Sequence, residues 1–243
     1  AAGRWHSLAR TADGALYSWG GGGFGRLGHG DEASLRLPTR VGALAGVRVV
    51  GMAAGAHHTL ALSDAGQPYS WGFGGNGRLG HGDTEPRLLP TPISALGAQS
   101  QLAVTCIAAG AHHSLAVTDH GALLTWGEGG GGRLGHGDID SLVGLPRGVY
   151  TNTDRLTPTA VEALRGVHVT AASAGEDHCL AVTRAGEAYG WGDYGRESTL
   201  GMPRHSQAGG AAGGGAAGAV RGPLRYEGVA MDLRFRRDAA STP

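Results

Sequence analysis

The stretch AAGAHHTLALSDAGQPYSWGFGGNGRLGHGD, residues 53–83, decides the fold, because most of the chain consists of copies of it. Close copies begin at Ala1 and Ala108, and a fourth, eroded copy, SAGEDHCLAVTRAGEAYGWGDYGRESTLGM, begins at Ser173. In all four copies, 16 residues separate the glycine of the Ala-Gly step from the tryptophan of the Trp-Gly step. Such constant spacing indicates one repeated structural unit, which has to be established before any shorter motif is interpreted.

Each copy contains two expected strands joined by a tight turn. In the run HHTLAL, alternation places His58, Leu60 and Leu62 on one face and the smaller residues on the other. The turn signal SDAG follows, and residues 68–71 form a second strand. The pair is therefore predicted to be an antiparallel hairpin.

The remainder of each unit supplies two more short strands. A Pro-Thr step introduces one apolar run, and alternating apolar residues lead into the next Ala-Gly step. Four strands in a unit that cannot bury its own faces are typical of a β-propeller blade, so we expect an all-β propeller. A β-sandwich would not explain repetition at this period, and the coil of a β-helix would be shorter.

The repeats divide the chain into a propeller region and a tail. Repeats cover residues 1–202, with cores at about 1–31, 53–83, 108–138 and 173–202. The tail, residues 203–243, is rich in glycine and alanine, a composition typical of a disordered segment.

An insertion lengthens the third unit within residues 139–157, IDSLVGLPRGVYTNTDRLT. Loops on rigid scaffolds often carry binding residues, whereas the alternative is a solvated, variable loop without function. The side chains predicted to contact a partner are Arg147, Tyr150, Asn152, Asp154 and Arg155.

Composition restricts the possible partners and compartments. The formal net charge is zero and only 16% of residues are charged, which gives no electrostatic signal for nucleic acid or an acidic membrane. All 20 basic residues are arginine, so lysine Schiff-base chemistry is excluded within this chain. Cys106 and Cys179 are interpreted as buried, reduced thiols. With no signal peptide or membrane helix recognisable, we expect an intracellular protein of the cytoplasm or nucleus.

Short motifs that suggest cofactors have structural explanations. Residues 23–28, GFGRLG, fit the dinucleotide pattern GxGxxG, and residues 75–80 and 130–135 also fit it. A dinucleotide site requires a helix after the motif, whereas His-Gly-Asp follows here each time. We therefore interpret these glycines as turn residues and expect no cofactor.

The repeated histidines and tryptophans are also predicted to be structural. The adjacent pair His57-His58 points to opposite faces of a strand and cannot chelate a metal as a pair. No nucleophile elbow or asymmetric catalytic cluster is recognisable, so we expect no enzyme activity. The residues predicted to tie the turns and blades together are His6, His58, His113, His178, Trp19, Trp71, Trp126 and Trp191.

The motifs AGxHH[TS]LA[LV], DxG, YSWG and GxxGRLGHGD together resemble the regulator of chromosome condensation repeat, a family of seven-bladed propellers. The resemblance covers about residues 1–202 and implies an incomplete propeller, with about four of the seven four-stranded blades. The fourth copy departs from the pattern, since residues 195–202 read GRESTLGM. We expect a fragment of a longer protein, or an open sheet edge that another subunit covers.

The resemblance implies several functions, because the family's activities diverge. The first hypothesis is a non-enzymatic scaffold for protein–protein interaction. The alternatives are a guanine nucleotide exchange factor for a Ran-type small GTPase, with residues 139–157 as a wedge, and the substrate-recognition propeller of a HECT-type ubiquitin ligase. The expected partner is a protein, with a small GTPase or a ubiquitin-pathway protein as candidates. Photoreception, as in the plant ultraviolet-B receptor, would need several tryptophans beside the repeat histidines, where only Trp5 stands.

Overall fold

The computed structural model describes residues 1–97, 100–137 and 153–192, together with the backbone of the pair Ala219–Val220. Within these ranges every regular element is a β-strand or a single-turn 3-10 helix. The predicted all-β architecture is therefore confirmed.

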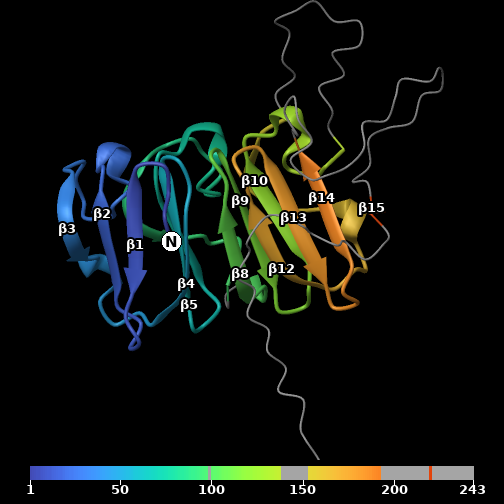
Figure 1. Cartoon of the computed structure of the whole chain (residues 1–243), viewed down its shortest axis with the longest axis horizontal. Coiled ribbons are helices and arrows are strands. Elements are labelled where there is room, and N and C mark those ends of the chain that lie inside the picture. The colour runs from blue at the N-terminus through green and yellow to red at the C-terminus, as the bar shows by residue number, and fades with distance from the viewer. Residues whose placement is uncertain (98–99, 138–152, 193–218, 221–243) are drawn as a thin grey trace, which may run out of the picture.

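The strands form four antiparallel sheets that stand side by side in chain order (Figure 1). Blade 1 contains β1 (His6–Arg10), β2 (Leu16–Gly20) and β3 (Leu35–Arg40). Blade 2 contains β4 (Val49–Ala54), β5 (His58–Ser63), β6 (Pro68–Gly72) and β7 (Arg87–Pro92). Blade 3 contains β8 (Val104–Ala109), β9 (His113–Thr118), β10 (Leu123–Gly127) and β11 (Arg155–Ala160). Blade 4 contains β12 (Val169–Ala174), β13 (His178–Thr183), β14 (Ala188–Gly192) and β15 (Ala219–Val220).

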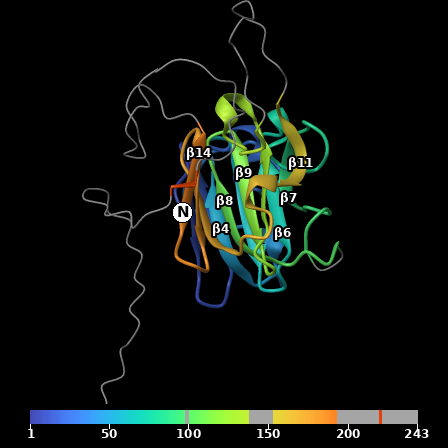
Figure 2. The same ribbon diagram turned by 90° about the vertical axis from the view of Figure 1, so that its right-hand side faces the viewer.

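Each blade is a meander in which every strand pairs with its neighbours in the sequence. The predicted hairpin is formed by β5 and β6, with His58 opposite Gly72 and Leu62 opposite Pro68. The inner strand β8 contacts both β4 and β12. Strands β4 and β8 also lie side by side in the turned view (Figure 2). In blade 1 an isolated bridge between Ala2 and Ser7 stands beside β1.

The hydrophobic core lies between neighbouring blades. All residues of β5 are buried, because blades 1 and 3 cover its two faces. Leu60 and Leu62 pack with Trp126 in the core between blades 2 and 3, whereas Ala61 packs with Leu16 between blades 1 and 2. This division agrees with the alternation predicted from the sequence.

Short 3-10 turns of two kinds connect the strands. The turns that follow the Trp-Gly steps are η1 (Gly23–Gly25), η3 (Gly75–Gly77) and η5 (Gly130–Gly132). The turns that precede the inner strands are η2 (Gly42–Leu44) and η6 (Glu162–Leu164). The GxGxxG motifs lie in the first set, and η1 and η3 each pack on the outer strand of the next blade. Within the described ranges no long helix follows them, and the glycines lie in 3-10 turns.

The structure describes residues within the predicted insertion and within the predicted tail. Strand β11 begins at Arg155, so the last three residues of the predicted insertion 139–157 are strand. Strand β15 lies within the predicted tail and pairs with β14 through Ala188–Val220 and Tyr189–Ala219. The rest of the tail lies outside the described residues.

Candidate functional site

The repeated histidines join each blade to the next. Each ring nitrogen Nε2 contacts a small polar side chain that follows the histidine of the next blade. The three contacts are His6 to Thr59 (2.8 Å), His58 to Ser114 (3.0 Å) and His113 to Cys179 (3.1 Å). Cys179, predicted to be a buried thiol, therefore stands at the position of a serine or threonine.

We call these contacts, together with the carbonyl group that each small side chain bonds next, the histidine relay. This second hydrogen bond determines which ring nitrogen of the histidine carries the hydrogen. The hydroxyl of Thr59 donates its only hydrogen to the carbonyl of Arg26, at 2.7 Å. It can therefore only accept from His6, which carries its hydrogen on Nε2. Burial, with a smaller contribution from Arg26, lowers the pKa of His6 to about 4, and burial lowers the pKa of His113 to about 3. Both rings are neutral at pH 7.

The blade tryptophans bond to the same arginine carbonyls. Their ring nitrogens donate to the preceding blade, in the pairs Trp71–Arg26 (2.9 Å), Trp126–Arg78 (3.0 Å) and Trp191–Arg133 (3.0 Å). Trp19 is half-buried, since no preceding blade covers it among the described residues. One main-chain oxygen thus receives both the tryptophan and the histidine relay of the next blade.

Above this scaffold lies a surface that we name the loop face. It consists of the turns after the Ala-Gly steps, residues 4–5, 56–57, 111–112 and 176–177, together with η1, η3 and η5. The turn positions read Arg-Trp, Ala-His, Ala-His and Glu-Asp in the four copies, so the first and fourth turns differ from the two central ones. A hollow of about 580 Å³ lies between these turns, and Arg4 and Glu176 meet across it at 4.0 Å. This exposed ion pair contributes little to stability.

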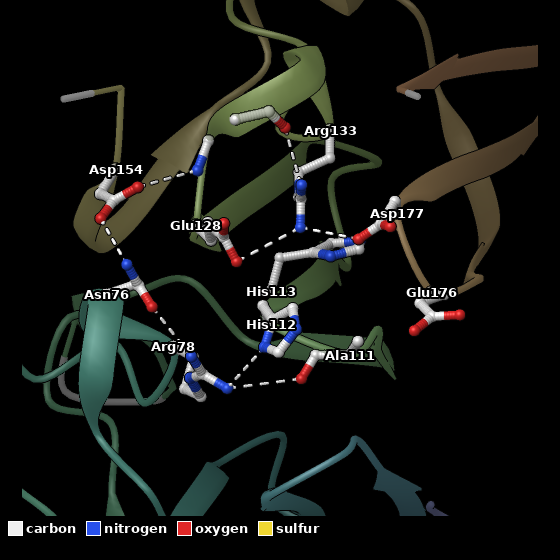
Figure 3. A network of polar contacts seen from close by, with 12 residues as sticks. Asn76, Arg78, Ala111, His112, His113, Glu128, Arg133, Asp154, Glu176 and Asp177 are labelled. Atoms are coloured by element: carbon white, nitrogen blue, oxygen red, sulfur yellow. Dashed lines mark hydrogen bonds and ion pairs between the residues drawn. The ribbon is translucent and has the colours of Figure 1, made fainter. Parts of the chain in front are cut away.

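Arg133 is the centre of the acidic end of the loop face. Its Nη1 contacts Asp177 Oδ1 at 2.7 Å and Glu128 Oε2 at 3.3 Å (Figure 3). The two carboxylates come from blades 4 and 3, so the guanidinium joins these blades and is neutralised within the chain. Such multiple charge-assisted contacts are stronger than a single exposed ion pair.

Arg78 holds the equivalent place one blade earlier, with neutral partners. Its Nη1 donates to His112 Nδ1 at 3.0 Å and to the carbonyl of Ala111 at 3.4 Å. Its Nη2 donates to Asn76 Oδ1 at 2.9 Å (Figure 3). Burial first, and then the positive charge of Arg78, lower the pKa of His112. His112 is therefore a neutral acceptor.

Phe24 gives the other end of the loop face an aromatic character. Its ring lies 4.6 Å from Phe73 and 5.7 Å from His57, with Arg26 over its face at 5.9 Å. Its φ of 61° falls in the left-handed region, where Asn76 and Gly131 stand in the next two copies. A phenylalanine is unfavourable there, and backbone strain of this kind concentrates at functional sites.

Replacing Phe24 by asparagine is expected to stabilise the protein against urea. The left-handed conformation costs an ordinary residue about 1–2 kcal/mol and asparagine less, while the lost aromatic contacts are worth about 0.5–1 kcal/mol. The expected net gain is about 0.5–1 kcal/mol in the free energy of unfolding. Phe73→Asn, which relieves no strain, should instead destabilise. Equal losses in the two variants would contradict this interpretation.

The residues predicted in the insertion are only partly described. Arg147, Tyr150 and Asn152 lie outside the described residues. Asp154 accepts hydrogen bonds from Asn76 Nδ2 at 2.9 Å and from the amide of Gly129 at 3.0 Å (Figure 3). Arg155 opens β11. The C-terminal end of the insertion is therefore anchored at the loop face, between η3 and blade 3.

Two other kinds of site were sought in the described residues. No group of three or more histidine, cysteine, aspartate or glutamate side chains there could hold a metal ion. No helix in those ranges has the length and hydrophobicity needed to cross a membrane.

The repeated geometry agrees with a comparison against protein families. The Regulator of chromosome condensation (RCC1) repeat matches residues 13–62, 65–117 and 120–182, which is more than half of the chain. The chain belongs to the RCC1-repeat family. The predicted resemblance, and an incomplete RCC1-type propeller, are therefore confirmed.

Similar RCC1-repeat proteins have different activities. The ultraviolet-B receptor UVR8 of Arabidopsis thaliana is 40% identical over 202 residues, which are 83% of this chain and 42% of that protein. The E3 ubiquitin-protein ligase HERC2 of Homo sapiens is 42% identical over 195 residues, which are 79% of this chain and 4% of that protein. The chain thus spans less than half of either relative.

Solved RCC1-type structures share the fold. Human WBSCR16 has a TM-score of 0.64 and 26% identity, with 79% of this chain and 46% of that chain covered. Yeast RCC1 (Prp20), solved with Kap60 bound, has a TM-score of 0.62 and 26% identity, with 79% and 42% covered. Another study of Prp20 describes its binding properties to Gsp1p and histones. Protein binding is therefore a property of structurally similar propellers.

The RCC1 motif contains functional candidates that sequence reasoning missed. The arginines of the three Gly-Arg-Leu-Gly motifs are buried, with 6%, 2% and 9% exposure for Arg26, Arg78 and Arg133. The signal was present in the sequence, because the same arginine recurs in all three Gly-Arg-Leu-Gly motifs. Its neighbours come from the next blade and could not be identified without the fold.

Proposed function

We propose that the chain is a non-catalytic recognition segment of an RCC1-type propeller, and that it binds a partner protein through the loop face. The observation that carries the proposal is the contrast between scaffold and turns. Buried relay histidines recur at fixed positions, whereas the turn positions vary, with an exposed tryptophan at 5, half-buried histidines at 57 and 112, and a half-buried aspartate at 177. Rigid scaffolds that present varied side chains on loops are suited to recognition, and RCC1-type propellers are generally non-catalytic.

Site-specific photocrosslinking tests which surface is used. A benzophenone amino acid at Phe24, which is 41% exposed on the loop face, is expected to give covalent adducts with partner proteins in a native extract. The same amino acid at Leu37, 74% exposed on β3, is the matched control and is expected to give none. Adducts formed equally from both positions would contradict recognition through the loop face.

The insertion is proposed as a second contact next to the loop face. Deleting residues 141–152 leaves Asp154 and its two anchoring hydrogen bonds in place. The deletion is expected to reduce adducts from position 24 while leaving the β-rich circular dichroism spectrum unchanged. Full adduct yield after the deletion would remove the insertion from the proposed interface.

Nucleotide exchange on a small GTPase is a second candidate function. It is favoured by the similarity to Prp20, whose binding to Gsp1p has been described. The test is release of a fluorescent guanine nucleotide from the GTPase Gsp1p in the presence of the full chain. Accelerated release would support an exchange factor. Unchanged release would contradict exchange activity and leave recognition as the proposed function. The similarity to HERC2 also supports a role as the recognition propeller of a ubiquitin ligase.

A further inference from the structure

The three buried arginines occupy equivalent places in successive blades. Arg26, Arg78 and Arg133 each end a 3-10 turn and donate Nε to a glycine carbonyl three residues earlier, at 2.7–2.8 Å. Each also lies at the junction with the next blade, because its carbonyl receives the relay described above. The fold thus repeats one guanidinium site three times.

At the site in blade 3, carboxylates of the chain itself pair with the arginine. Arg133 meets Asp177 at 2.7 Å and Glu128 at 3.3 Å. Asp177 comes from the turn after the Ala-Gly step of blade 4, and Glu128 follows the Trp-Gly step of blade 3. The chain itself therefore shows which group suits an arginine in this place, namely a carboxylate at the loop face.

The two earlier sites lack that group. His57 and His112 stand where Asp177 stands, and Gly21 and Phe73 stand where Glu128 stands. Among the described residues, no carboxylate lies within ion-pair distance of Arg26 or Arg78. Among the residues that the structure describes, Arg26 Nη1 donates only to the carbonyl of Ala56, at 3.4 Å.

Burial lowers the pKa of Arg26, and Glu32, which is exposed and outside ion-pair distance, offsets this only in part. The carboxylates near Arg78 are engaged elsewhere. Glu128 contacts Arg133, and Asp154 accepts from Asn76 and from the amide of Gly129. Both raise the pKa of Arg78 from a distance, but burial dominates and holds it at about 10. A buried guanidinium without an adjacent negative charge is unfavourable, and a carboxylate supplied from outside would remove that cost.

We propose that the loop face binds an acidic segment of the partner protein, whose carboxylates pair with Arg26 and Arg78 as Asp177 pairs with Arg133. This inference deepens the proposed function and rests on it. The half-buried rings of His57 and His112 are the groups that the incoming carboxylates displace. The aromatic pair Phe24 and Phe73 lies with these arginines, so an apolar side chain between the acidic residues completes the segment.

Two labelled peptides and two double variants of the full chain test this proposal. The peptides are Glu-Glu-Phe-Glu-Glu and its neutral counterpart Gln-Gln-Phe-Gln-Gln, and binding is measured by fluorescence polarisation. The parent chain is expected to prefer the glutamate peptide by about tenfold, which a single charge-assisted pair can supply. H57D/H112D copies Asp177 into both sites and should lose that preference. H57N/H112N is the matched neutral control and should keep it.

Two results would overturn the proposal. One is equal affinity of the parent chain for the two peptides, and the other is an equal loss in the aspartate and asparagine variants. Urea unfolding of both variants identifies a loss caused by misfolding, since the aspartate variant is expected to be at least as stable as the asparagine one. Photocrosslinking from position 24 separates the two proposals. If position 24 gives adducts but the parent chain binds the two peptides equally, the loop face binds a partner and the proposal of an acidic ligand is wrong.

Discussion

At pH 5 the protein is expected to be about 6 kcal/mol less stable than at pH 7, and to unfold as the pH falls further. The cause is the set of relay histidines, His6, His58 and His113, which are buried and neutral. Burial lowers the pKa of His6 to about 4 and that of His113 to about 3, and places that of His58 well below 6.5. In the unfolded chain all three titrate near 6.5.

The sign follows from proton binding. Between pH 6.5 and about 4, the unfolded chain binds about three protons at the relay histidines that the folded chain excludes, so stability falls as the pH falls. Burial also lowers the pKa values of His29, His57, His81 and His112, which changes stability in the same direction. Three protons correspond to about 4 kcal/mol for each pH unit, against a total stability of about 5–15 kcal/mol for an ordinary domain. The pKa of Asp83 is also lowered, but its stabilisation is lost only at lower pH.

Urea unfolding at several pH values measures this slope. His113→Gln keeps a side-chain amide donor but binds no proton, so the slope is expected to fall by about 1.4 kcal/mol per pH unit even though the variant is less stable at pH 7. A slope unchanged by His113→Gln, or equal stability of the parent at pH 5 and pH 7, would contradict the neutral relay.

The histidine relay illustrates which features of the fold could be predicted from the sequence and which could not. Strand alternation identified His58, Leu60 and Leu62 as one face, because alternation in a strand is a local property. The partners of the relay histidines were not predictable, because nothing in the local pattern distinguishes Thr59, Ser114 and Cys179 from other small residues of a strand. Their common place after the repeat histidine was visible in the copies, but its meaning depends on how one blade sits against the next.

The same reason limits prediction of the candidate site. The loop positions of His57, His112 and Asp177 could be located from the repeat. Their shared neighbours, Arg78 and Arg133, could not, since each pair joins two blades more than 30 residues apart in the chain. The insertion residue Asp154 was predicted to contact a partner, and its hydrogen bond to Asn76 within the chain was not foreseen.

Replacing Gly80 by alanine is expected to destabilise the protein by about 3 kcal/mol or more. Gly80 has a φ of +81°, which costs an alanine about 1–2 kcal/mol. In addition, a Cβ at this position would lie 2.8 Å from Trp126 Nε1, which bonds to the carbonyl of Arg78 at 3.0 Å. Relieving that contact means moving a fully buried indole or losing its hydrogen bond, and either costs about 1–3 kcal/mol.

Gly82→Ala is the matched control in the same motif. Gly82 has a φ of +88°, but a Cβ there would meet only Thr157 Cγ2, at an ordinary 3.7 Å. It should therefore show the backbone cost alone, about 1–2 kcal/mol, in the same urea titration. The difference between the two variants measures how tightly the glycine-rich turn of blade 2 is held against the tryptophan of blade 3. Equal destabilisation would mean that the glycines serve only the conformation of the turn, and that the blades are joined by the histidine relay and the apolar core.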